Sequence, residues 1–311
     1  MASSSLKEKR ILRDIKTFIN SKLDNVGIYC DIDDSNLDVL KAMIIGPKNT
    51  PYENGFYFFE INFPCDYPYN PPKVTFMTSS KNVRFNPNLY TNGKVCLSIL
   101  GTWNGPGWSA ALSLNTVLLS IQSLLNENPI QNEPGYENEI GNKCKKYNKL
   151  IEYYNINIAT LNMLEKPPYG YDIFLDIMKK HFVKNIDYYN NYIKINLKDD
   201  MTTTISTTYG MSSILRIKDL ENRIKSKYSL LLNDPNINAN NANNTINTNV
   251  DNSDISLNNI KDKKTKKCPS DPAKLYDIGY VKLSDNDNKN YVVIEAKGPK
   301  RTFKKWVLNK V

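Results

Sequence analysis

The stretch PYENGFYFFEINFPCDYPYNPPKVTF, residues 51–76, carries the pattern that decides the fold. Residues 55–63 and 73–77 are short segments rich in β-branched and aromatic residues, a composition typical of strands. Between them, residues 64–72 hold four prolines in nine positions, which excludes regular structure and predicts a stiff loop. Together with a similar segment at 37–45, these patterns predict consecutive strands of an antiparallel meander.

Helical patterns lie on both sides of these strands. Apolar residues recur on one face of each pattern, and Ser5 is available to cap the first helix. The expected helices cover residues 5–23, 113–125, 142–165, about 171–194 and about 211–232. We therefore expect an α+β fold, with an N-terminal helix before a four-stranded antiparallel meander, C-terminal helices and a helical extension.

The composition changes after the last predicted helix. Residues 233–260 contain twelve asparagines in 28 positions and cannot bury enough apolar surface to order themselves. The lysine-rich run KDKKTKK extends this stretch, and an alternating pattern returns near the C-terminus. We predict a core domain (1–165), a helical extension (166–232), a disordered linker (233–268) and a small basic β-rich segment of unknown role (269–311).

The net charge of +9 is concentrated in one part of the chain. Residues 1–165 carry 16 Lys and Arg against 16 Asp and Glu, whereas residues 261–311 carry 14 against 6. A broad basic face on the core is therefore excluded as the basis of nucleic-acid binding. For the tail, nucleic acid or another acidic partner stays open, and KDKKTKK fits a nuclear-import signal or a plain linker.

The cysteines indicate a reducing compartment. The five cysteines are odd in number, widely scattered and without a CxxC pair, which argues against both disulfides and a zinc site. The first residues, MASSSLKEKR, have no apolar run of a secretory signal, and no apolar stretch approaches a membrane span. We expect a cytoplasmic protein without a membrane span or cofactor, with a nuclear location also possible.

One cysteine stands in an unusual context, RFNPNLYTNGKVCLSIL, residues 84–100. Cys96 follows an Asn-Gly turn and lies eight residues after Asn88, while the only histidine of the chain, His181, lies in a distant predicted helix. A protease-type dyad would have to recruit that histidine. Exchange of one thioester for another needs no such partner, because the two sulfurs are similar in basicity. An inert buried thiol is the alternative.

These motifs resemble the ubiquitin-conjugating (E2) family over residues 5 to about 165. The Tyr-Pro-x-x-Pro-Pro loop at 67–72, Pro-Asn before Cys-Leu, and Trp108 with its following helix occur in the family's order and spacing. The stretches LGTWNGPGWS and ENPIQNEPGYE, and the helices to about 232, are similar to the Z branch of the family. The resemblance implies an enzyme that accepts ubiquitin or a ubiquitin-like modifier from an E1 activating enzyme on Cys96. The modifier then passes to a protein substrate's lysine or to an E3 ligase.

The resemblance also implies catalytic roles for other residues. Asn88 would donate to the oxyanion that forms when a lysine attacks the thioester, or would brace the loop. Asn86 stands where the family usually has a histidine that buttresses this loop. Glu133 falls near the acidic position that orients and deprotonates the incoming lysine, whose free pKa is about 10.4, with Glu127 as a competing candidate. The alternative function is a non-catalytic E2-like module that only binds ubiquitin or organises a complex, but such relatives lack the cysteine.

Two partner surfaces follow from the same resemblance. The surface expected to meet the E1 consists of Lys7, Lys9, Arg10 and Arg13, on the basic face of the first helix. The edge expected to meet an E3 consists of Phe63, Pro64, Ser109 and Ala110. At this edge, Ala110 replaces a proline that is usual in the family.

Overall fold

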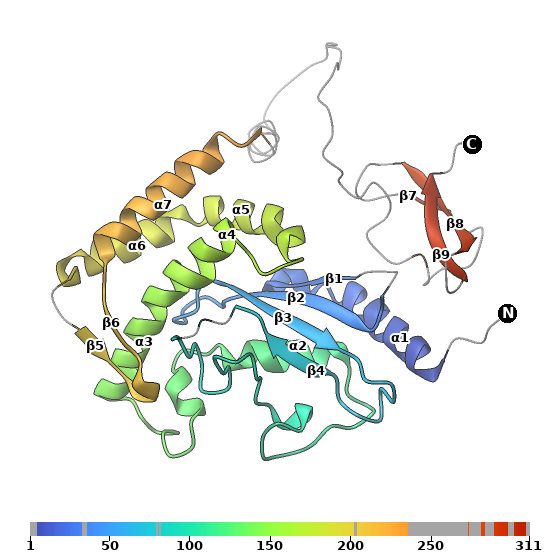
Figure 1. Ribbon diagram of the computed structural model, residues 1–311, viewed down its shortest axis with the longest axis horizontal. Coiled ribbons are helices and arrows are strands. Elements are labelled where there is room, and N and C mark those ends of the chain that lie inside the picture. Colours follow the sequence, from blue (N-terminus) through green and yellow to red (C-terminus); the bar gives the residue numbers. More distant parts are fainter. Residues whose placement is uncertain are drawn as a thin grey trace, which may run out of the picture.

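The computed structural model describes residues 5–32, 36–78, 80, 82–201, 204–235, 273, 281–283, 289–297 and 302–308. Its helices are α1 (Leu6–Ser21), α2 (Leu114–Leu124), α3 (Asn142–Tyr154), α4 (Met163–Glu165), α5 (Leu175–Lys184), α6 (Ile186–Asn196) and α7 (Ile217–Leu232). Its strands are β1 (Ile28–Asp31), β2 (Val39–Ile45), β3 (Phe56–Asn62), β4 (Lys73–Phe76), β5 (Thr204–Ser206), β6 (Ser212–Ile214), β7 (Val281–Leu283), β8 (Asn290–Lys297) and β9 (Thr302–Leu308). Figure 1 shows their arrangement.

The central sheet confirms the predicted meander. Its strands follow the order β1-β2-β3-β4, and each neighbouring pair is antiparallel. The predicted segments at 37–45, 55–63 and 73–77 contain β2, β3 and β4. In the register, Met43 faces Phe58 and Phe59 faces Phe76, so aromatic and apolar side chains meet across the strands.

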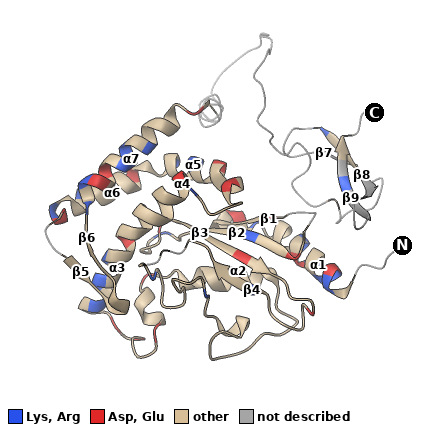
Figure 2. Ribbon diagram, in the orientation of Figure 1, with Lys and Arg blue, Asp and Glu red and all other residues tan. Residues whose placement is uncertain are grey.

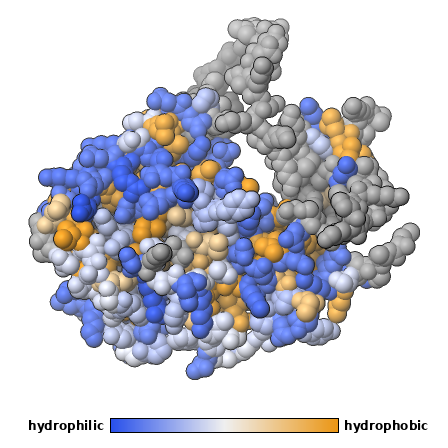
Figure 3. Space-filling model, in the orientation of Figure 1, coloured by the Kyte–Doolittle hydropathy of each residue, from blue (hydrophilic) through white to orange (hydrophobic). Residues whose placement is uncertain are grey.

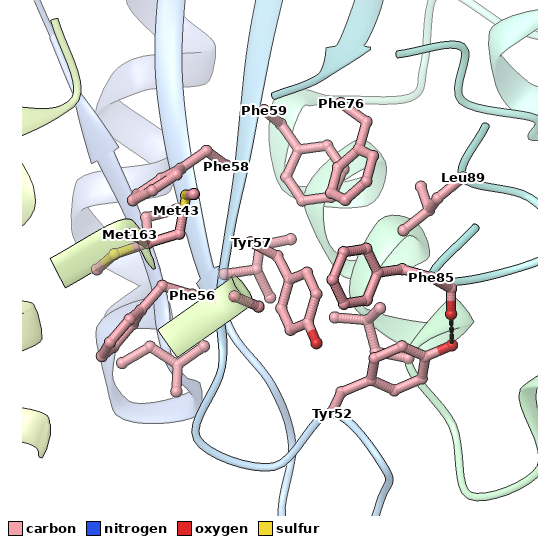
Figure 4. Packing of buried hydrophobic residues seen from close by; sticks show 14 of the residues in the cluster. Met43, Tyr52, Phe56, Tyr57, Phe58, Phe59, Phe76, Phe85, Leu89 and Met163 are labelled. Carbon is pink, nitrogen blue, oxygen red and sulfur yellow. Dashed lines mark hydrogen bonds between the residues drawn. The ribbon is translucent and has the colours of Figure 1, made fainter. Parts of the chain in front are cut away.

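Both faces of β3 are covered. On one face Phe58 packs against Tyr171 and Phe174, with ring centroids 5.0 and 6.1 Å apart. On the other face Tyr57 meets Phe85 edge to face at 5.7 Å. Figure 4 shows these alternate side chains of β3 pointing to opposite sides. Because Tyr171 and Phe174 belong to the C-terminal extension, this extension is packed onto the core rather than appended to it.

The helices at the start of the chain follow the sequence pattern closely. Ser5 caps α1 by accepting a hydrogen bond from the backbone N–H of Glu8 at 3.1 Å, as expected. The single helix predicted over 142–165 consists of α3, a π-helical segment at Asn155–Asn162, and α4, which follow one another without a break. Along α1 the basic residues outnumber the acidic ones, Glu8 and Asp14, and both signs of charge are visible on this helix in Figure 2.

The extension differs from its prediction between 204 and 216. The helix expected from about 211 begins only at Ile217, and the preceding residues form an antiparallel hairpin of β5 and β6. The chain reverses at Tyr209 and Gly210, whose φ angles of 63° and 66° are left-handed and incompatible with a continuing helix. The expectation of a helix at 211–216 is therefore wrong, because two left-handed residues turn the chain there.

The C-terminal segment holds an antiparallel sheet with the order β7-β8-β9. Both β7 and β8 lie in the alternating stretch near the C-terminus, and β9 is an additional strand. The predicted linker at 233–268 lies outside the described residues apart from its first three positions. Among the helices that the structure describes, none is both long and apolar enough to cross a membrane. On the face drawn in Figure 3, hydrophobic residues gather only in small groups among hydrophilic ones.

Candidate active site

A tight turn brings Cys96 beside Asn88. Tyr90 and Lys94 pair through a backbone hydrogen bond of 2.9 Å, and Gly93 closes the turn with φ of 89°. A side chain at Gly93 would also meet Thr75 Cγ2 at 2.9 Å, so glycine is required for both reasons. The Asn-Gly pair seen in the sequence thus folds the chain back on itself and sets the register of Asn88 against Cys96.

Asn88 holds Cys96 from two sides. The backbone N–H of Cys96 donates to the backbone oxygen of Asn88 at 2.8 Å, and Asn88 Nδ2 donates to the backbone oxygen of Cys96 at 2.8 Å. Asn88 Oδ1 is buried and has no hydrogen-bond partner among the described residues. In this structure the amide therefore braces the cysteine loop.

Cys96 itself is nearly inaccessible. The residue is 1 % exposed. It is not itself part of the buried apolar cluster of the core, which includes its neighbour Val95. Thr102 Oγ1 binds the backbone on both sides of Cys96: it donates to Val95 O at 2.7 Å and accepts from Leu97 N at 2.9 Å. The cysteine therefore has almost no exposed surface in this structure.

Asn86 buttresses the loop from within the core. It is 0 % exposed, and its Nδ2 donates to Tyr52 Oη at 2.9 Å and to Leu124 O at 2.7 Å. Its Oδ1 accepts from the backbone N–H of Asn88 at 2.9 Å. Tyr52 in turn donates to the backbone oxygen of Phe85 at 2.7 Å, the bond drawn in Figure 4. The asparagine thus supplies both donors and an acceptor at the position where the family usually has a histidine.

A third asparagine, Asn132, joins the network of Asn86 and Asn88 and was missed by sequence reasoning. Its Nδ2 lies 3.4 Å from Asn86 Oδ1 and 3.2 Å from Leu124 O. Asn132 directly precedes Glu133, so the candidate acidic residue follows a position tied to the Asn86 network. Its nearness to Glu133 in ENPIQNEPGYE was the one sequence signal that could have drawn attention to it.

The two acidic candidates lie in different surroundings. Glu133 Oε2 accepts a hydrogen bond of 2.6 Å from the hydroxyl of Tyr209 in the β5–β6 hairpin. Glu127 lines a separate cavity of about 900 Å³ that also borders Lys149 and Tyr192 of α3 and α6. Each candidate directly follows an asparagine tied to the Asn86 network, Glu133 after Asn132 and Glu127 after Asn126, and the Glu133 carboxylate is the one that contacts the hairpin.

His181 has no part in this site. Its Nε2 lies 2.8 Å from Asn54 Oδ1, and its ring meets Phe56 edge to face at 5.9 Å. Burial lowers the pKa of His181 to about 4, and the nearby Lys184 adds to this effect. A neutral imidazole bound to Asn54 does not form a dyad with Cys96, whose described hydrogen bonds all involve Asn88.

The basic face of α1 divides into exposed and internal positions. Lys9 and Arg13 are exposed, and the half-buried Lys7 forms an ion pair of 3.0 Å with Asp38. Arg10 is buried, binds Asp14 at 3.0 Å and donates to the backbone oxygens of Ala110 and Leu112. Arg10 therefore ties α1 to the loop after Trp108 and is not available on the surface.

The expected E3 edge contains buried and exposed positions side by side. Phe63 is 4 % exposed, with its ring 4.7 Å from that of Tyr67, whereas Ser109 and Ala110 are exposed and Pro64 is partly so. Trp108 Nε1 donates to the backbone oxygen of Pro68 at 2.7 Å. This bond joins the two loops that make up the edge. No group of three or more potential metal ligands lies together in the part of the chain that the structure describes.

Comparison with known proteins identifies the family of the chain. The family model described as "Ubiquitin-conjugating enzyme" matches residues 10–156. Ubiquitin-conjugating enzyme E2 Z of Xenopus tropicalis is 41 % identical over 228 residues, covering 70 % of this chain and 72 % of the relative. The human enzyme of that name is 46 % identical over 182 residues, covering 58 % of this chain and 51 % of the relative.

Among solved structures, the E2 domain of a ubiquitin conjugating enzyme from Toxoplasma gondii aligns with a TM-score of 0.38 and 29 % identity, covering 49 % of this chain and 98 % of that one. The resemblance inferred from the sequence motifs, including that to the Z branch, is confirmed by the curated relatives. The chain belongs to the ubiquitin-conjugating enzyme (E2) family.

Proposed function

We propose that this E2 carries ubiquitin, or a ubiquitin-like modifier, as a thioester on Cys96 and passes it to a substrate lysine or an E3 ligase. The observation that carries the proposal is the reciprocal hydrogen bonding of Asn88 and Cys96 at the end of a rigid turn. A cysteine without an imidazole partner is suited to thioester exchange and poorly suited to peptide hydrolysis.

In the charging step, the thiolate of Cys96 attacks the thioester carbonyl of the modifier on the activating enzyme. A new carbon–sulfur bond forms at Cys96, and the activating enzyme's cysteine leaves as a thiolate, so no net oxidation occurs. The proton lost from Cys96 is balanced by the one that the leaving thiolate takes up. Because Cys96 is 1 % exposed, this step includes a displacement of the segments that cover the sulfur.

In the discharge step, a lysine amine attacks the same carbonyl, an amide bond forms, and Cys96 leaves as a thiolate. The attacking nitrogen must lose a proton, which Glu133 or water can accept. The developing oxyanion requires a donor, and Asn88 Nδ2, which lies 2.8 Å from the backbone oxygen of Cys96, can supply it once it releases that oxygen. Asn88 thus braces the loop at rest and is available to the oxyanion during transfer.

The partners are those that the family resemblance implies. We propose an E1 contact through Lys7, Lys9 and Arg13 and an E3 contact through Pro64, Ser109 and Ala110. Phe63 is buried and lies behind the proposed E3 edge. Arg10 is also buried and links the helix of the proposed E1 contact to Ala110 of the E3 edge.

We also propose a cytoplasmic location, with the nucleus open. For the basic C-terminal segment 269–311 we propose nucleic acid or another acidic partner. A non-catalytic ubiquitin-binding role is the second candidate, but a retained cysteine and asparagine argue against it.

Charging by a purified activating enzyme with ATP and ubiquitin tests the proposal. Wild type is expected to form an adduct that reducing agent cleaves, and Cys96→Ser an ester adduct that resists it. Cys65→Ser is the matched control, because Cys65 is exposed while Cys96 is buried. An adduct that survives in Cys96→Ala but is lost in Cys65→Ser would overturn the proposal, as would the absence of any adduct across activating enzymes and modifiers.

A further inference from the structure

The β5–β6 hairpin of the extension contacts the core at two places. At its turn, the hydroxyl of Tyr209 donates to Glu133 Oε2 at 2.6 Å. The hairpin makes a second contact where the backbone N–H of Arg84 meets the sulfur of Met211 at 3.1 Å. Arg84 lies four residues before Asn88, and Glu133 follows Asn132, which binds Asn86, so the hairpin contacts two parts of the core next to the Asn86–Asn88 network.

Tyr209 is held in an unfavourable backbone conformation. Its φ and ψ angles are 63° and 20°, in the left-handed region that is unfavourable for a non-glycine residue. Such a conformation persists only when surrounding contacts outweigh the cost. Here Thr207 N donates to Met211 O at 2.8 Å across the turn, and the ring of Tyr209 meets Tyr147 edge to face at 6.3 Å.

Arg84 connects this ring to the cysteine loop. Its guanidinium carbon lies 4.2 Å from the ring centroid of Tyr209 and 3.7 Å from that of Tyr90. Its Nη2 donates to the backbone oxygen of Pro87 at 2.6 Å, one residue before Asn88. The tyrosine ring therefore packs on a cation that itself fixes the loop.

The hydroxyl of Tyr209 keeps its proton and so remains a hydrogen-bond donor to Glu133. Burial, together with the hydrogen bond and charge of Glu133, raises the pKa of Tyr209 far above its usual range, so the proton stays on the phenol at neutral pH. A neutral phenol bound to a carboxylate fixes the position of that carboxylate.

We propose that Tyr209 is a positioning residue for transfer, which holds the carboxylate of Glu133 where it meets the incoming lysine amine. The inference rests on the proposed function, since it needs Cys96 as carrier and Glu133 as the group that orients the amine. Its consequence is that the C-terminal extension completes the reaction centre of this E2. The extension would then act on discharge and leave charging unaffected.

One substitution removes the hydrogen bond to Glu133 and keeps the packing of the aromatic ring. Tyr209→Phe removes one oxygen and keeps the ring on Arg84. A cavity of about 500 Å³, lined by Arg84, Tyr209 and Met211 among others, adjoins the site and leaves room for water to reach the polar groups after the substitution. We therefore expect Tyr209→Phe to fold with a melting temperature close to that of wild type.

A double-mutant cycle measured by single-turnover discharge of the full-length ubiquitin thioester to free lysine tests the proposal. Tyr209→Phe is expected to charge within about twofold of wild type and to discharge roughly tenfold more slowly. Glu133→Gln is expected to be slower still, and the double variant no slower than Glu133→Gln alone, because Tyr209 acts through Glu133. Tyr192→Phe is the matched control, since its hydroxyl is buried in the same extension without a partner among the described residues.

Three results would overturn the inference while leaving the proposed function intact. They are discharge by Tyr209→Phe at the wild-type rate, an equal loss in charging and discharge, and effects of Tyr209→Phe and Glu133→Gln that multiply in the double variant. If wild type itself takes no modifier onto Cys96, the proposed function fails, and the inference fails with it.

Discussion

Replacing Asn86 by alanine tests whether this residue buttresses the cysteine loop, the role of the histidine that is usual in the family. The side chain donates to Tyr52 Oη and Leu124 O and accepts from the N–H of Asn88, all inside a fully buried site. In Asn86→Ala, Leu124 O keeps Asn132 Nδ2 at 3.2 Å, and Tyr52 keeps its bond to Phe85. The N–H of Asn88 loses the acceptor that it has in this structure.

The expected loss of stability follows from the hydrogen bonds that Asn86→Ala removes. A buried N–H left without an acceptor costs about 1–3 kcal/mol, and each of the two lost donated bonds contributes about 1 kcal/mol. The total is roughly 3–5 kcal/mol, which lowers the melting temperature of a domain of this size by roughly 10 °C. Because the same substitution frees the backbone of Asn88, we also expect slower discharge of the Cys96 thioester.

Urea and thermal unfolding followed by circular dichroism measure the first effect, and single-turnover discharge measures the second. The control is Asn104→Ala, a change at an exposed position in the loop after Cys96, which we expect to alter stability by less than about 0.5 kcal/mol. If Asn86→Ala loses less than about 1 kcal/mol and discharges normally, then the buttressing role assigned to Asn86 is wrong.

Two further predictions concern Asn88 and His181. Asn88→Ala is expected to charge nearly normally and to discharge to free lysine roughly 10²–10³-fold more slowly, as after loss of an oxyanion donor; equal loss in both steps would leave only the bracing role. His181 has a folded pKa of about 4, below its unfolded value of about 6.5. The unfolded state therefore binds more protons between these values, and stability should fall as the pH drops from about 6.5 to 4, by on the order of 3 kcal/mol. His181→Gln should flatten this part of the pH profile of unfolding, and an unchanged slope would contradict the assignment.

The strands and the cysteine loop could be predicted because local sequence determines them. Alternating and continuous apolar runs fixed β2, β3 and β4, and the Asn-Gly pair fixed the turn that sets Asn88 against Cys96. The short strand β1, Ile28–Asp31, was not singled out, since four residues carry too little pattern to separate a strand from a loop.

Other features depend on contacts between distant segments and left no local signal. The left-handed turn at Tyr209 is stabilised by Arg84, which lies 125 positions earlier in the chain. Arg10 was placed on the basic face of the first helix, yet it is buried because Asp14, one turn later, neutralises it and the loop after Trp108 accepts its hydrogen bonds. Periodicity alone cannot tell a charged residue on a solvent face from one paired inside.

The identity of the cysteine that carries the modifier is the most direct test of the account. After a single round of charging with activating enzyme, ATP and ubiquitin, mass spectrometry of the non-reduced wild-type protein locates the acylated thiol. We predict a single ubiquitin thioester on Cys96, despite its 1 % exposure, and none on the exposed Cys65. A thioester found on Cys65, or on any thiol other than Cys96, would contradict the account.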